Sequence, residues 1–255
     1  MYNLMLIYDM KNAIFNKKMI LALALVLVCL FVGGAEVLFN NSEGIDFSYL
    51  FLFSLSCGTS SVLALIYPVL ACIPYSDTYS VEKSSGYLFY KRVKKEKSRY
   101  ILSKWLSCGV SGGLVISVPV AMYLVICLLS KGTNLVDEGM QYVTHNINFY
   151  QHAPVLYCFG YVGNAFICGM IFSIMGLAIS VFIKNRYLII FLPLVIYIVL
   201  NILFSDMMIN LNPILWWDIN LINESNSVFV TGVKFFVLII VSIIFAIGVI
   251  LDDKE

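Results

Sequence analysis

The sequence has very little charge. Only 12% of its 255 residues are Asp, Glu, Lys or Arg, whereas about 25% is typical of a soluble domain. Hydrophobic residues make up 61% of the chain, and the mean hydropathy is +0.92. Because so few charges cannot cover a surface that faces water, the composition excludes a soluble globular protein and indicates that lipid is the main solvent.

The motifs of nucleotide and metal chemistry are missing as well. The chain contains no Walker A pattern, no HExxH and no Gly-rich dinucleotide fingerprint. Its two histidines, His145 and His152, lie in one polar segment, and its seven cysteines lie in or beside apolar stretches without a CxxC pair. We therefore expect no catalytic residue, no metal and no cofactor on this chain. The net charge of +1 gives no indication of nucleic-acid binding.

Six long apolar runs are present. They cover about 19–39, 47–75, 105–129, 155–183, 187–205 and 231–251. About 20 apolar residues cross a bilayer as a helix, and solid runs without alternating polarity exclude membrane β-strands. The sequence thus predicts an all-α integral membrane protein of six spans, in a single transmembrane domain over 1–255.

The basic residues indicate an orientation. With the amino terminus inside the cell, all but two of the 16 Lys and Arg fall in cytoplasmic segments, and the two exceptions are Lys131 and Lys234. We expect a multi-pass protein of the cytoplasmic membrane with both termini in the cytoplasm.

The first 18 residues are predicted to form an interfacial helix. Asp9, Asn12 and Asn16 recur at spacings of three and four among apolar residues, as in a helix that lies on a membrane. Alternatively, Lys17-Lys18, the apolar run and Gly33-Gly34-Ala35 resemble a cleavable signal. The apolar first residues and the five later spans favour the interfacial helix.

The segment 76–104 is the one sizeable cytoplasmic loop. Asp77 to Ser85 is predicted to form a short helix, which Gly86 would close in a left-handed conformation. A basic cluster follows, with the charge to bind anionic lipid headgroups, and it consists of Lys91, Arg92, Lys94, Lys95, Lys97 and Arg99.

The outer segment before the last span is unusually apolar. It is too apolar to lie free in water and too interrupted by Asp, Asn and Pro to span. We expect a re-entrant or interfacial helix there, with Trp216 and Trp217 at headgroup depth.

Small residues mark two of the spans. Gly109 and Gly113 form a GxxxG pattern in the third span, and Gly169, Ser173 and Gly176 form a stripe on the fourth. Such residues allow helices to approach closely, so we predict helix packing at these positions.

The order of these parts resembles the type-2 permease subunits of ATP-binding-cassette exporters. The resemblance covers essentially the whole chain, and its most specific part is Val81-Glu82-Lys83-Ser84-Ser85-Gly86-Tyr87-Leu88, followed by Tyr100-Ile101-Leu102-Ser103-Lys104. The sequence departs from the commoner pattern at Tyr87 to Tyr90 and in its dense Lys run, where a Pro-containing turn is frequent.

The resemblance implies a function. The short helix after span two would be a coupling helix that docks on a separate ATPase subunit, through Asp77, Tyr79, Glu82, Ser85 and Gly86. It also implies a dimer of permease chains, identical or paired with a sister chain, with ATP and Mg bound by the partner ATPase. The cargo would be an amphipathic or lipophilic molecule moved outward, such as an antimicrobial peptide, as in self-immunity, or a drug. An ion-coupled transporter or channel, an integral membrane enzyme and a sensor without cargo are the alternatives.

Overall fold

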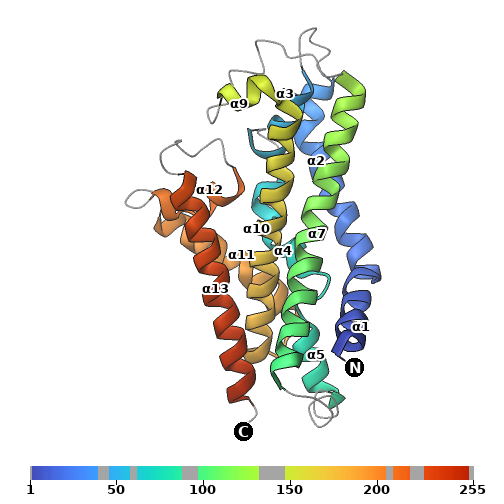
Figure 1. The fold of residues 1–255 in the computed structure, drawn as a ribbon, viewed down its shortest axis with the longest axis vertical. Coiled ribbons are helices and arrows are strands. Elements are labelled where there is room, and N and C mark those ends of the chain that lie inside the picture. The colour runs from blue at the N-terminus through green and yellow to red at the C-terminus, as the bar shows by residue number, and fades with distance from the viewer. Residues whose placement is uncertain are drawn as a thin grey trace.

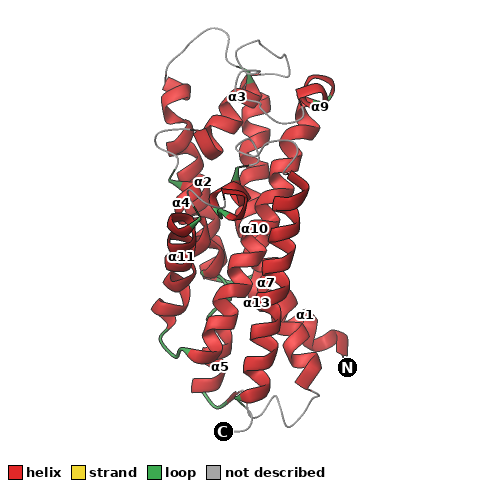
Figure 2. Cartoon of the chain, turned by 90° about the vertical axis from the view of Figure 1, so that its left-hand side faces the viewer, coloured by secondary structure: helices red, strands yellow, loops and turns green. Residues whose placement is uncertain are grey.

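The computed structural model describes residues 2–39, 46–57, 62–87, 97–131, 147–204, 209–218 and 227–252, and every regular element in these ranges is a helix (Figure 2). Five helices are long and apolar enough to cross a membrane. They are α2 (Lys17–Phe39), α7 (Lys97–Lys131), α10 (Pro154–Phe182), α11 (Arg186–Leu203) and α13 (Ser227–Leu251). The prediction of an all-helical, multi-pass membrane architecture is confirmed in this coarser form.

The predicted second span is divided. It consists of α3 (Phe47–Leu52), the π-helical segment η1 (Phe53–Cys57) and α4 (Leu63–Cys72), and residues 58–61 between them lie outside the described part. The hydroxyl of Ser54 donates to the Leu50 carbonyl at 2.7 Å, a contact that bends helices, and Pro68 interrupts hydrogen bonding in α4. Within the described residues, five helices are thus long and apolar enough to span a membrane, whereas the sequence predicts six spans.

Gly33 and Gly34 of α2 lie against this irregular segment. A Cβ on Gly33 would lie 2.7 Å from the Ser54 carbonyl oxygen, and one on Gly34 would lie 2.4 Å from the Ser54 hydroxyl. Gly33 lets the backbone of α2 approach that of η1, and Gly34 leaves room for the Ser54 side chain. In the sequence, the same two glycines resemble part of a signal cleavage site.

The central pair of the bundle is α7 and α10, with α1 (Tyr2–Ile14) and α2 on one side and α13 on the other (Figure 1). At one end of the bundle lie α1, α5 (Thr78–Ser84) and the last residues of α13, and we refer to it as the α5 end. The opposite end, the α9 end, carries α3 and α9 (Ile147–His152). The short helices η2 (Ile209–Leu211) and α12 (Ile214–Trp217) belong to the segment before α13, and α12 lies below the level of α9 in Figure 1.

Small residues bring α7 and α10 together. A Cβ on Gly169 would lie 2.4 Å from the Gly112 carbonyl oxygen, and one on Gly113 would lie 2.6 Å from the Phe166 ring. The Ser173 hydroxyl also donates to the Cys108 carbonyl at 2.8 Å. Gly109 packs on Met170 and Ile174 of α10, and Gly176 packs on Ser76 and Cys72. The closest approach involves Gly112, which the GxxxG pattern does not include.

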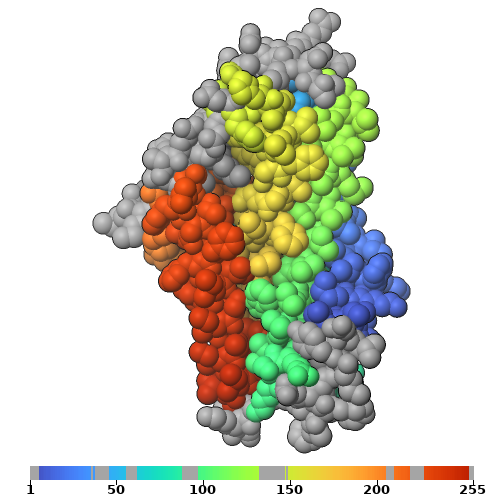
Figure 3. All heavy atoms as spheres, viewed as in Figure 1, coloured from blue at the N-terminus to red at the C-terminus, as the bar shows by residue number. Residues whose placement is uncertain are grey.

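The outer face of the bundle is apolar. In Figure 3 the side chains of α13 cover one flank of the molecule, next to α10. The exposed residues of this helix include Phe235, Phe236, Ile239, Ile243 and Ile247. Such a face suits lipid or another apolar helix and does not suit water.

Candidate functional site

The helix α5 is held at the end of the bundle by polar contacts to several other helices. It spans Thr78–Ser84, and Gly86 follows with φ +73°, a conformation that glycine adopts without strain. Of the residues that the family resemblance implicates, Asp77 and Tyr79 are buried and Glu82 is partly buried, whereas Ser85 and Gly86 are exposed. The sequence does not reveal this division.

A buried cluster of charged residues joins α5 to α1 and α7. The Lys104 ammonium lies 2.7 Å from a Glu82 carboxylate oxygen and 3.5 Å from one of Asp9. Lys104 is 0% exposed and Asp9 is 1% exposed. Ion pairs in such surroundings interact more strongly than surface pairs, and removing one partner leaves an uncompensated buried charge.

Three hydroxyl groups complete this cluster. The Tyr75 hydroxyl accepts a hydrogen bond from Lys104 at 2.8 Å and donates one to Asp9 at 3.3 Å. Ser103 donates to Asp9, and Tyr100 donates to Glu82, both at 2.8 Å. Each carboxylate therefore has both a cation and a hydroxyl donor, which is how a buried charge is stabilised.

The two ends of α5 have further polar partners. Before its first turn, Asp77 pairs with Lys18 of α2 at 2.7 Å. Near its last turn, Lys83 pairs with Asp252, the residue after α13, and the Tyr79 hydroxyl donates to the same carboxylate at 2.7 Å. Ser80 donates to the Lys184 carbonyl, between α10 and α11, at 3.1 Å. A displacement of α5 would thus act on α2, α13 and the turn between α10 and α11.

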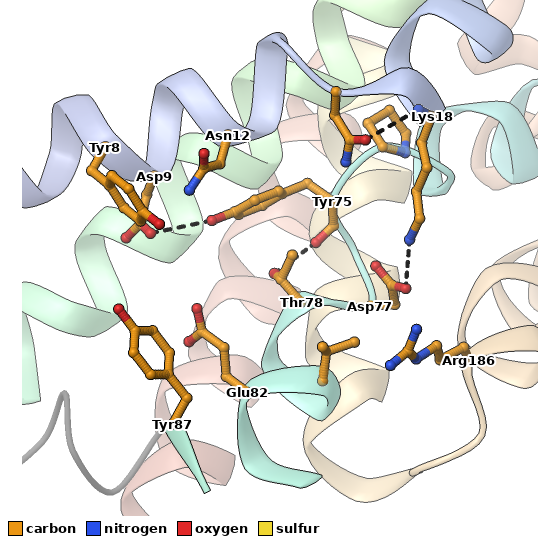
Figure 4. A pocket seen from close by; sticks show the side chains of 13 residues that line it. Tyr8, Asp9, Asn12, Lys18, Tyr75, Asp77, Thr78, Glu82, Tyr87 and Arg186 are labelled. Atoms are coloured by element: carbon orange, nitrogen blue, oxygen red, sulfur yellow. Dashed lines mark hydrogen bonds and ion pairs between the residues drawn. The ribbon is translucent and has the colours of Figure 1, made fainter. Parts of the chain in front are cut away.

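A polar cavity of about 270 Å³ lies beside α5 (Figure 4). Asp9 and Asn12 of α1, Glu82 of α5 and Arg186 of α11 are among its lining residues. The polar side of α1, which the sequence predicts to meet lipid headgroups, lies along this cavity.

The basic cluster lies largely outside the described residues. Lys91, Arg92, Lys94 and Lys95 fall in the range 88–96, which the structure does not describe. Lys97 and Arg99 lie in the first turn of α7, and both are exposed.

A second polar site lies between α10, α12 and α13. Lys234 is 4% exposed, and its ammonium donates to the Asn164 amide oxygen at 2.6 Å. The Asn164 amide nitrogen donates to the carbonyls of Trp216 at 2.9 Å and Trp217 at 3.0 Å. The sequence places Lys234 at the outer edge of the last span, and the structure shows that its side chain is buried inside the bundle. An isolated Lys in the otherwise apolar run before Leu251 is the signal that could have identified it.

The two tryptophans of α12 are buried inside the protein. Trp216 is 2% exposed and Trp217 is 4% exposed, and the Trp217 indole donates to the Leu55 carbonyl at 3.0 Å. The ring of Trp217 stacks on that of Tyr67 at 4.6 Å. These indoles therefore face the interior of the protein, and their position at headgroup depth stays a prediction.

One hydrolase-like pattern has a structural explanation. Gly109-Val110-Ser111-Gly112-Gly113 matches the GxSxG of nucleophile elbows, which requires a sharp turn from strand to helix. Ser111 instead lies within α7, is 0% exposed and donates to the Cys108 carbonyl of its own helix at 3.0 Å. This serine packs between helices and is not presented as a nucleophile.

Within the described ranges, no group of three or more His, Cys, Asp or Glu side chains is arranged to hold a metal ion. Comparison of the chain with protein-family models, with curated proteins and with solved structures finds no match.

Proposed function

We propose that this chain is the membrane permease subunit of an ATP-driven exporter, with α5 as the helix that couples it to a separate ATPase. The observation that carries the proposal is the set of polar contacts that fix α5 to α2, α7 and the end of α13, and through Lys104 to α1. A partner can shift a conformational equilibrium only through different contacts in the two states, and α5 has the connections to pass such a difference on.

The structure suggests two roles for the residues that the family resemblance implicates. Ser85 and Gly86 are exposed at the end of the bundle and would contact the ATPase. Asp77, Tyr79 and Glu82 point to other helices and would transmit the movement of α5.

The remaining parts of the proposal follow from the charge distribution and the family resemblance. The α5 end would face the cytoplasm with both termini, because it carries most of the basic residues. Two permease chains would form a dimer in the cytoplasmic membrane, and ATP and Mg would bind only to the ATPase. The cargo would be amphipathic or lipophilic, such as an antimicrobial peptide or a drug.

The first experiment is affinity purification of the tagged full chain from its native membrane. We expect an ATPase subunit to co-purify with the wild-type chain. Gly86→Val, which forces a β-branched residue into φ +73°, and Ser85→Arg should abolish co-purification. Ser130→Arg is the matched control, since Ser130 is exposed at the last turn of α7, toward the α9 end.

A second variant separates docking from transmission. Glu82→Gln should retain the ATPase yet lose cargo export, because its carboxylate contacts Lys104 and Tyr100 inside the protein. Export that continues without any ATPase would contradict the proposal and support an ion-coupled transporter.

A further inference from the structure

Lys234 is a buried cation with few partners. It lies seven residues after Ser227, which is about 10 Å along α13 at the usual helical rise. Its ammonium has three N–H donors, and its hydrogen bond in the structure is to the neutral amide of Asn164. Among the described residues, no carboxylate lies within 4.0 Å of this ammonium.

Burying an ammonium without a counterion costs a few kcal/mol even on permissive membrane scales. The hydrogen bond to Asn164 of α10 holds Lys234 in the bundle, although its long side chain is capable of reaching a membrane surface.

Asn164 is oriented toward Lys234 by the backbone of α12. The carbonyls of Trp216 and Trp217 can only accept hydrogen bonds, so the amide nitrogen of Asn164 must face them. Its amide oxygen is consequently fixed on the side of Lys234. The buried indole N–H of Trp216, on the same segment, also finds no hydrogen-bond acceptor among the described residues.

The space around this site is small in the present conformation. A cavity of about 10 Å³ lies beside Asn164, between Leu55, Tyr161, Ala165 and Trp217, and it is at the lower limit for one water molecule. The carbonyls that hold Asn164 belong to α12. A group larger than a water molecule does not fit in this cavity without a movement of the surrounding side chains or helices.

We propose that Lys234, oriented by Asn164, binds the phosphate or carboxylate head of an anionic amphiphile. An anion supplies the charge and the acceptors that the ammonium does not find among the described residues, and the exposed apolar side chains of α13 suit a hydrocarbon tail. The inference goes beyond the permease proposal. Binding to this site requires no ATPase, so the two proposals can fail separately.

The test uses the purified full chain in phosphatidylcholine nanodiscs, with a Trp105→Phe substitution so that fluorescence reports on the two tryptophans of α12. Dodecyl phosphate is the anionic probe, and dodecyl maltoside, with the same tail, is the neutral one. We expect saturable binding of dodecyl phosphate at least tenfold tighter than that of dodecyl maltoside. Equal affinities would overturn the proposal.

Three variants locate the binding. Lys234→Gln should weaken dodecyl phosphate binding at least tenfold, and Lys234→Arg should retain it. Lys131→Gln, which removes the same charge at the end of α7, is the control. Equal effects of Lys234→Gln and Lys131→Gln would also overturn the proposal.

If Lys234→Gln does not fold, Lys234→Met decides, because it keeps a long unbranched side chain and removes the charge and its N–H donors. We expect at least a tenfold loss of affinity in that variant, and unchanged affinity would contradict the proposal. Competition by phosphatidylglycerol in the nanodisc would identify a lipid ligand, and competition by inorganic phosphate would identify a free anion.

Discussion

Removing the buried cation Lys104 should destabilise the protein more than removing either of its carboxylate partners. Lys104→Met takes away the ammonium that Asp9 and Glu82 both contact, and Asp9 is 1% exposed. Breaking a buried ion pair from one side costs about 3–5 kcal/mol. Glu82→Gln leaves Lys104 with Asp9 at 3.5 Å and the Tyr75 hydroxyl at 2.8 Å, so its cost should be roughly half as large.

Thermal unfolding of the purified chain in one detergent measures this difference. A protein of this size loses about 2–4 °C of Tm per kcal/mol, so Lys104→Met should lower Tm by about 6–20 °C. Glu82→Gln should lower it by about half that amount. The double variant should lose less than the sum of the two single losses, because the residues interact directly. An equal effect of the two single variants, or strict additivity, would refute the assignment of a shared buried cluster.

Three further predictions concern packing, orientation and α12. Gly169→Ala should lower Tm by several degrees, since its Cβ would lie 2.4 Å from a backbone oxygen, whereas Gly163→Ala, whose Cβ would meet nothing within 4 Å, should not lower it. In a variant without the native cysteines, Ser85→Cys should react with a membrane-impermeant thiol reagent only from the cytoplasm, and Ser130→Cys should react only from outside. The reverse pattern would contradict the proposed orientation, in which the α5 end faces the cytoplasm. Trp217→Phe should cost about 1 kcal/mol through loss of the 3.0 Å hydrogen bond to the Leu55 carbonyl, and unchanged thermal unfolding would show that this bond contributes nothing.

The membrane architecture could be predicted from the sequence because long apolar runs have few structural solutions in lipid. The positions of the five long helices follow directly from these runs. The division of the second span could not be predicted in the same way. It depends on contacts that only the folded chain makes, such as the backbone approach of Gly33 to Ser54.

The location of the candidate site could be predicted from the sequence, but the orientation of its polar side chains could not. Periodicity gives α1 a polar stripe and α5 its length, yet it does not say what a polar side chain faces. Asp9 and Glu82 turn toward Lys104 inside the bundle, although a headgroup or a docked partner would satisfy the same pattern in sequence. The orientation rule counts basic residues in loops and so places Lys234 on the outer side. It gives no indication that this side chain is buried between helices.

The helix α13 connects the two polar sites. Lys234 contacts Asn164 near the start of the helix, and Asp252, directly after its end, pairs with Lys83 of α5. These two positions are 18 residues apart, about 27 Å along a continuous helix. A helix of this kind moves largely as a unit, so a displacement of α5 that pulls on Asp252 also shifts Lys234 relative to α10. Under the proposed function, a movement that the ATPase imposes on α5 would thereby reach the contacts between Lys234, Asn164 and α12. An anion bound at Lys234 would bias the same movement from the other side, because coupling between two sites is reciprocal.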